Sequence, residues 1–290
     1  IAKTNPSIVY VATGDAVGSL SVTSPYYSIG LLKTTNGGET WETTGLSYEF
    51  ESGNQITRIL VHPKNENIVL AATAKGIYRT TDGGKFWEQV SPGGYFKDME
   101  FHPNDPDYVY ASTFSYFFNT AIYRSSDNGR NWELMKQFSD VIRIALAVTR
   151  KNSNHVYALC SLVNYKSFHS VQISTDMGKT WQIVTDSDTP NLLGRYKGTG
   201  GDSQTGQGWY DLCLAVHPNN TNTIHTGGIN IWKSGNFGYS WDMNTHWVGY
   251  YNKPYVHADI HDMEYQNNST KLFAAHDGGI DYTTNGGSSW

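Results

Sequence analysis

Short runs rich in β-branched and aromatic residues alternate along the whole chain with segments rich in Gly, Asn, Asp and Pro. One stretch places such runs at residues 56–61, 68–73, 76–81 and 86–90. The residue types in the runs favour strands, whereas those between them favour turns. No segment keeps a hydrophobic period of 3.6 residues, so the pattern predicts an all-β protein.

An eight-residue pattern occurs six times: Ser or Thr, any residue, Asp or Asn, any residue, Gly, any two residues, and Trp. Its copies occupy residues 34–41, 80–87, 125–132, 174–181, 234–241 and 283–290, and their tryptophans are 46, 45, 49, 60 and 49 residues apart. His-Pro pairs at 62–63, 102–103 and 217–218 fall between predicted strands. Four strands in a repeat of about 45 residues predict a blade of a β-propeller.

The eight-residue pattern resembles the Asp-box (BNR) repeat of sialidases, GH74-type xyloglucanases and sortilin-like receptors. The resemblance covers nearly the whole chain and implies a β-propeller, but the box marks architecture and names no activity. An acidic or amide side chain can accept hydrogen bonds from the turn, and Gly permits a positive φ. We therefore expect Asp82, Asp127 and Asp176 to be structural, with the box tryptophans packed between units.

We expect one propeller domain over residues 1–290, with an inserted loop at 187–208. The expected blades are at about 1–50, 51–95, 96–140, 141–186, 209–256 and 257–290. The first unit lacks an innermost strand, and the last stops at its box Trp. The two ends could complete one blade together, but the sequence favours a fragment of a larger propeller, of about seven blades or double.

Composition excludes several classes of function. The net charge is -5 and no stretch concentrates Lys or Arg, which argues against a nucleic-acid binder with a basic face. No apolar run has the roughly 18 residues of a membrane span. The only two cysteines, Cys160 and Cys213, exclude a disulfide scaffold. They are interpreted as buried thiols, or as a disulfide if their strands touch.

Candidate chemistry follows from blade topology, because loops that enter innermost strands share one face with loops between second and third strands. The Asp boxes fall on the opposite face. The longest entry loop, 187–208, carries Arg195, Tyr196 and Asp202 and leads into Tyr210 and Asp211. Long loops in compact repeats are usually functional or disordered, so this one is either a binding loop or a flexible insertion.

Another candidate is the predicted start of the last innermost strand, where His257, Asp259 and His261 alternate. Alternating residues on a strand share a face. Two imidazoles and a carboxylate there could ligate a divalent metal such as Zn²⁺, with no other cofactor indicated. The other interpretation is a hydrogen-bonded polar network that closes the channel.

The same mouth should also receive His276, a further binding candidate, and several carboxylates. A glycoside hydrolase of the inverting type needs two carboxyl groups roughly 6.5–9.5 Å apart. The candidates for such a pair are Asp15, Asp202, Asp259 and Asp277. A sialidase is not expected, because the sequence has no Arg-Ile-Pro motif and offers too few free arginines for a carboxylate-binding triad.

Residues 14–46, 206–218, 255–262 and 274–280 are also similar to secreted Asp-box propellers of Bacteroidota, many of which resemble type IX secretion cargo. This resemblance implies a secreted or cell-surface location and contact with secretion or cell-surface machinery. Our first hypothesis is an extracellular module that binds a polysaccharide or a cell-surface protein through its polar loop face. The alternative is a GH74-like endo-glycosidase that uses two of the mouth aspartates.

Overall fold

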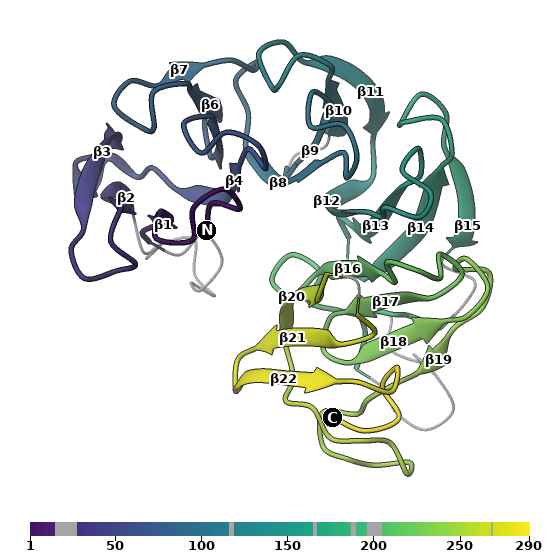
Figure 1. Ribbon diagram of the computed structural model, residues 1–290. Coiled ribbons are helices and arrows are strands. Elements are labelled where there is room, and N and C mark those ends of the chain that lie inside the picture. Colours follow the sequence, from purple (N-terminus) through teal and green to yellow (C-terminus); the bar gives the residue numbers. More distant parts are fainter. Residues whose placement is uncertain (15–27, 116–118, 165–166, 187–189, 196–204, 268) are drawn as a thin grey trace. The chain divides into compact units, whose positions relative to one another are not determined.

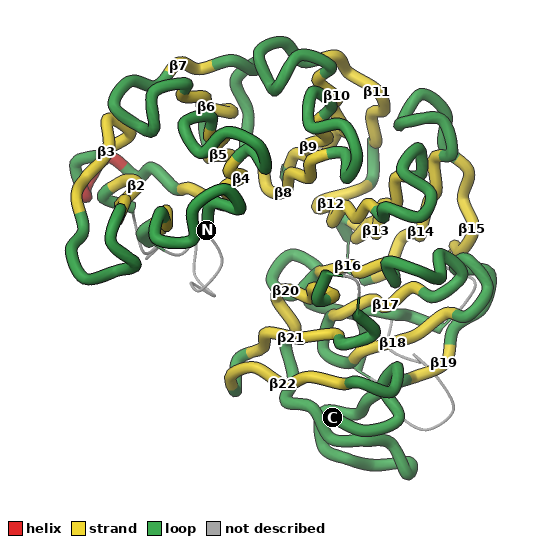
Figure 2. The backbone as a smooth tube through the Cα atoms, in the orientation of Figure 1, coloured by secondary structure: helices red, strands yellow, loops and turns green. Residues whose placement is uncertain are grey.

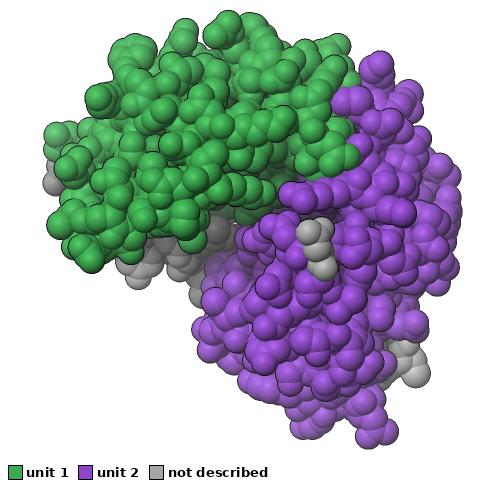
Figure 3. Space-filling view, viewed as in Figure 1, with its two compact units in different colours: residues 1–114, 121–136 green, residues 115–120, 137–290 purple. Residues whose placement is uncertain are grey.

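The computed structural model describes residues 1–14, 28–115, 119–164, 167–186, 190–195, 205–267 and 269–290 (Figure 1). Strands dominate these residues, and their one helical element is the short 3-10 helix η1 (Phe50–Ser52) (Figure 2). The chain divides into two compact units (Figure 3). Unit 1 comprises residues 1–114 and 121–136, and unit 2 comprises 115–120 and 137–290. The expectation of a single domain stays a prediction.

Unit 1 is built from three consecutive antiparallel sheets, each following the strand order of the chain. The first has three strands: β1 (Val9–Ala12), β2 (Gly30–Thr34) and β3 (Glu42–Ser47). The second consists of β4 (Ile56–Val61), β5 (Val69–Thr73), β6 (Gly76–Thr80) and β7 (Glu88–Gln89). The third consists of β8 (Phe96–Phe101), β9 (Val109–Thr113), β10 (Thr120–Ser125) and β11 (Glu133–Phe138), whose bounds extend slightly past the unit.

Unit 2 repeats this construction. Its first sheet consists of β12 (Val141–Val148), β13 (Val156–Leu162), β14 (Phe168–Ser174) and β15 (Gln182–Asp186). The next consists of β16 (Cys213–Val216), β17 (Ile224–Gly227), β18 (Ile231–Ser234) and β19 (Asp242–Met243). The last has three strands: β20 (Ile260–Tyr265), β21 (Leu272–His276) and β22 (Gly279–Thr283). These meandering sheets confirm the prediction of an all-β fold made of propeller blades.

Each Asp box begins at the last residue of a strand, namely β2, β6, β10, β14, β18 or β22, and its polar side chains bond within the turn. In the box at 174–181, Asp176 Oδ1 accepts the hydroxyl of Ser174 at 2.8 Å and the backbone N–H of Thr180 at 2.8 Å. The indole N–H of Trp181 donates to the carbonyl of Gly178 at 2.9 Å. The fourth box position has φ between 61° and 74° in all six copies. The expected structural role of the box aspartates therefore agrees with these contacts.

The His-Pro pairs close the turns between first and second strands. His102 Nδ1 accepts the backbone N–H of Asp105 at 2.9 Å, and His217 Nδ1 accepts that of Asn220 at 3.0 Å. Such a side chain satisfies a turn amide that no strand can pair.

Within unit 2, neighbouring sheets pack through their first strands, β12 on β16 and β16 on β20. An apolar cluster lies between the first two of these sheets and includes Leu159, Leu214 and Trp232. Burying such side chains stabilises each by about 1.5–3 kcal/mol. Cys160 and Cys213 are both buried thiols, which agrees with the first interpretation. Within the described residues, no helix is long and apolar enough to cross a membrane.

Candidate functional site

Three segments of unit 2 meet at one end of its strands. Residues 209–212 lead into β16, residue 259 leads into β20, and residues 276–279 contain the turn between β21 and β22. The antiparallel register pairs Ile260 with His276, which places the start of β20 beside the end of β21. The backbone N–H of Ile260 donates to the carbonyl of Gly228 at 2.9 Å, which joins this sheet to the preceding one.

The side chains of Tyr210, His261 and Asp277 contact one another there, and we call them the Tyr–His–Asp cluster. His261 Nε2 lies 2.6 Å from Asp277 Oδ1. The Tyr210 hydroxyl donates to the same carboxylate, at 3.1 Å from Oδ1 and 3.2 Å from Oδ2. The rings of Tyr210 and His261 meet edge to face with centroids 4.8 Å apart. The His261 and Asp277 side chains are 34% and 38% exposed, so a ligand can reach them.

An aromatic surface adjoins this cluster. The ring of Trp209 lies 5.6 Å from that of Tyr210, at an interplanar angle of 43°. Both side chains are partly exposed. The site thus combines aromatic ring faces with a carboxylate and an imidazole.

Arg143 of β12 holds the loop that carries Tyr210. Its Nη1 donates to the carbonyls of Trp209 at 3.2 Å and Tyr210 at 2.7 Å, and its Nη2 donates to that of Leu212 at 3.3 Å. The side chain is buried. The sequence analysis missed Arg143, although a lone Arg within the apolar run VIRIALAV was an available signal, because buried charge requires a partner.

Asp211 was predicted to bind ligand, but it is fully buried, so this interpretation is wrong for direct contact. Burial raises the pKa of its carboxyl well above the usual value, and the charge of Asp259 raises it further. Arg143 opposes this shift. Asp211 therefore lies behind the surface, within the packing that supports the site.

The predicted metal site at His257, Asp259 and His261 does not form. The three were expected to alternate along one strand, but β20 begins only at Ile260, and Asp259 has a left-handed φ of 65°. The register also shifts between Ile260 and Asp262, so the alternation is lost. In the described part of the chain, no group of three or more His, Cys, Asp or Glu side chains could hold a metal ion.

The members of that triplet have separate partners instead. Asp259 Oδ1 accepts the side-chain amide of Gln207 at 3.0 Å. His257 stacks on His276, with ring centroids 5.8 Å apart and an angle of 15°. His276 Nδ1 accepts the backbone N–H of Gly278 at 3.1 Å, which leaves Nε2 to donate to Asp281 Oδ2 at 3.1 Å.

Among the remaining predicted site residues, Arg195 alone belongs to the described part of the chain. Arg195 is exposed. Asp15, Tyr196 and Asp202 lie outside the described residues, so their roles stay predictions.

Comparisons with known proteins agree with this architecture. Residues 172–182 match the family model described as BNR/Asp-box repeat. Xyloglucanase Xgh74A of Acetivibrio thermocellus is 27% identical over 164 residues, which cover 44% of this chain but only 18% of that protein. The chain thus spans a small part of this curated relative.

Solved structures show the same fold. The GH74 xyloglucanase from Xanthomonas campestris matches 98% of this chain and 44% of its own, with a TM-score of 0.65 and 14% identity. The alignment with the structure described as YCF48 bound to D1 peptide covers 99% of this chain and 84% of that one, with a TM-score of 0.54 and 17% identity. The six boxes, the sheets and these likenesses together show a β-propeller fold that carries Asp-box repeats.

Proposed function

We propose that this chain is an extracellular glycan-binding β-propeller module and that the Tyr–His–Asp cluster contacts the glycan. The observation that carries the proposal is the meeting of Tyr210, His261 and Asp277 on an accessible surface beside Trp209. The similarity to xyloglucanases supports a polysaccharide as the ligand and a secreted or cell-surface location.

The chemistry of the cluster suits a sugar. A pyranose ring presents C–H groups that pack on aromatic faces. The residues Trp209 and Tyr210 are partly exposed, so a sugar can contact them. Sugar hydroxyls donate well to an ionised carboxylate, because charge-assisted hydrogen bonds are stronger than neutral ones. The carboxylate of Asp277 has further acceptor capacity beyond His261 and Tyr210.

The second candidate is a GH74-like hydrolase, which the xyloglucanase relatives favour. Hydrolysis needs two carboxyl groups flanking a glycosidic bond. Among the described candidates, Asp277 contacts His261 and Tyr210, and Asp259 contacts Gln207. Since the Tyr–His–Asp cluster itself contains a single carboxyl group, it supports binding better than catalysis.

Titration calorimetry with a xyloglucan heptasaccharide tests the proposal. We expect Tyr210→Ala and Asp277→Asn each to raise Kd about tenfold, because each removes an interaction worth roughly 1 kcal/mol or more. Asp242→Asn on β19 is the control, since this exposed carboxylate lies outside the cluster. Unchanged affinity in both cluster variants would contradict the proposed site.

A reducing-sugar assay on xyloglucan separates the two candidates. The binding module predicts no release of new reducing ends by the wild type. Release that disappears in Asp277→Asn, Asp259→Asn, Asp202→Asn or Asp15→Asn, but persists in Asp242→Asn, would establish the hydrolase instead.

A further inference from the structure

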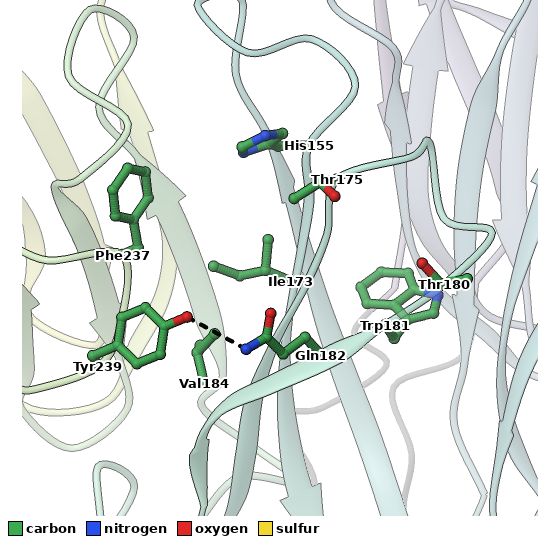
Figure 4. Close-up of a pocket in the computed structure, with 9 residues that line it drawn as sticks. All are labelled: His155, Ile173, Thr175, Thr180, Trp181, Gln182, Val184, Phe237 and Tyr239. Atoms are coloured by element: carbon green, nitrogen blue, oxygen red, sulfur yellow. Dashed lines mark hydrogen bonds between the residues drawn. The ribbon is translucent and has the colours of Figure 1, made fainter.

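A cavity lies between the first two sheets of unit 2, at the Asp-box end of their strands (Figure 4). Its volume is about 280 Å³, and its lining includes Trp181 and Gln182 from one sheet and Phe237 and Tyr239 from the next box. The amide of Gln182 lies 3.4 Å from the Tyr239 hydroxyl across it. Residues 174–182 and 234–241 follow the ends of β14 and β18, whereas the Tyr–His–Asp cluster lies at the opposite strand ends.

Comparing the six boxes shows which of the cavity-lining residues the box turn itself requires. At the position of Phe237 the other copies carry Gly37, Gly83, Asn128, Met177 and Gly286. Phe237 has a φ of 63°, in the left-handed region that a bulky side chain disfavours. The box turn therefore does not require an aromatic residue here, and tolerates this one at a cost.

Two neighbouring positions depart from the repeat as well. At the position of Tyr239 the other boxes carry Ser288 or a charged residue, namely Glu39, Lys85, Arg130 and Lys179. Tyr239 is 55% exposed, so its ring is not needed to fill the core. Directly after the box Trp, Gln182 replaces the acidic residue found after four other boxes, at Glu42, Glu88, Glu133 and Asp242.

These departures create one aromatic and uncharged lining. The lining residues of the cavity, all in the described part of the chain, include no Asp, Glu, Lys or Arg. His155 also lines it, and burial lowers the pKa of its imidazole, which is therefore neutral at pH 7. Neutral hydrogen-bonding groups remain at Gln182 and at Thr180.

We infer that this cavity is a second saccharide subsite, which holds one neutral pyranose residue between Trp181, Phe237 and Tyr239. Aromatic faces suit the C–H groups of a sugar ring, and neutral amide and hydroxyl groups suit its hydroxyls. The volume lies near the lower end of the range for ligand pockets, which limits the occupant to a small unit such as one ring. Because the subsite stands at the other strand ends, it is independent of the proposed function.

The repeat supplies variants that should fold. Phe237→Gly and Tyr239→Ser each install a residue found at the same position of another box, and so does Gln182→Glu directly after the box Trp. Met177→Gly is the matched control. It also replaces a large side chain with Gly at the left-handed fourth position of a box, but Met177 does not line the cavity. Binding is measured by titration calorimetry with a xyloglucan heptasaccharide and with cellotetraose.

We expect the wild type to show two sites per chain. Phe237→Gly combined with Tyr239→Ser should abolish one of them or weaken it at least about tenfold, and Met177→Gly should preserve both. A single site that disappears in Tyr210→Ala but survives the Phe237 and Tyr239 changes overturns the subsite and leaves the proposed function intact. A single site that survives Tyr210→Ala but disappears with the Phe237 and Tyr239 changes supports the subsite and overturns the proposed function. A wild type that binds neither saccharide at millimolar concentration overturns both.

Discussion

At the scale of single residues, the Asp box needs an acceptor oxygen rather than a charge. Asp176 Oδ1 accepts the backbone N–H of Thr180, and in the first box Asn36 Oδ1 accepts that of Thr40 at 3.0 Å. Three boxes carry Asp and three carry Asn at this position. Carboxylate and amide oxygens both satisfy the turn, which explains why the pattern accepts either residue.

The acidic boxes make stability depend on pH. Hydrogen bonds from the backbone N–H and side chain of Thr180 lower the pKa of Asp176 to about 2, and the pKa values of Asp82 and Asp127 are also lowered. A lowered folded-state pKa contributes stability above the unfolded value near 4, which is lost as pH falls toward 2.

The triple variant Asp82→Asn, Asp127→Asn and Asp176→Asn should therefore lose less stability than the wild type between pH 5 and pH 2. Urea midpoints at the two pH values measure this difference. Asp242→Asn is the control, because that residue lies outside the boxes. Equal losses in the triple variant and the wild type would show that the box charges do not matter.

Asp211 is predicted to reduce stability at neutral pH. Its raised pKa means that the folded state holds the proton where the unfolded chain has released it, so stability falls as pH rises from about 4. Asp211→Asn removes this titration at nearly constant volume, and it should raise the urea midpoint at pH 7 with little effect at pH 3. A lower midpoint at pH 7 would show instead that the ionised form is stabilised.

At the scale of elements, Arg143 of β12 links the first sheet of unit 2 to the loop that carries Tyr210. It bonds three carbonyls of that loop with a planar guanidinium, a geometry that the single ammonium of Lys cannot reproduce. Arg143→Lys should lower the free energy of unfolding by about 2 kcal/mol, since hydrogen bonds from charged groups contribute roughly 1.5–3 kcal/mol each.

The same variant should also weaken binding of a xyloglucan heptasaccharide, because the loop then holds Tyr210 less firmly. Arg150→Lys, at an exposed position just after β12, is the matched control. Chemical denaturation and calorimetry measure the two effects. If the Arg143→Lys variant is clearly destabilised but binds the heptasaccharide with wild-type affinity, Arg143 does not position Tyr210 for binding.

The elements were largely predictable because their signals are local. The hydrogen bonds of the box turn join residues within eight positions of one another. Those of the His-Pro turns join the imidazole to backbone N–H groups two or three residues further on. Blade topology also brought Tyr210, His261 and Asp277 to one end of the strands, as expected for loops of those classes. By contrast, Arg143 acts on a loop 66 or more residues away, and sequence spacing carries no such information.

The alternation of His257, Asp259 and His261 was misleading for a related reason. A period of two predicts a shared face only while the backbone stays extended. Here the left-handed Asp259 precedes β20, and the register shift beside Ile260 changes which way the next side chains point. At the same point the carbonyl of Gly228 in the neighbouring sheet accepts the backbone N–H of Ile260, a contact that sequence spacing does not reveal.

At the scale of the whole molecule, the described residues form six antiparallel sheets of consecutive strands, three in each unit. Repetition explains the fold, and departures from repetition mark the places that the fold does not require. The aromatic cavity beside Phe237 is such a place, and it lies in unit 2, as does the Tyr–His–Asp cluster. We therefore expect saccharide binding by residues 137–290 rather than by unit 1.

Hydrogen exchange with mass spectrometry, with and without a saturating xyloglucan heptasaccharide, tests the central claim most directly. If the Tyr–His–Asp cluster binds glycan, the ligand should slow exchange in peptides that contain residues 207–212, 259–262 and 276–279. Exchange that is unchanged in all three segments, whether or not other peptides are protected, would contradict the claim.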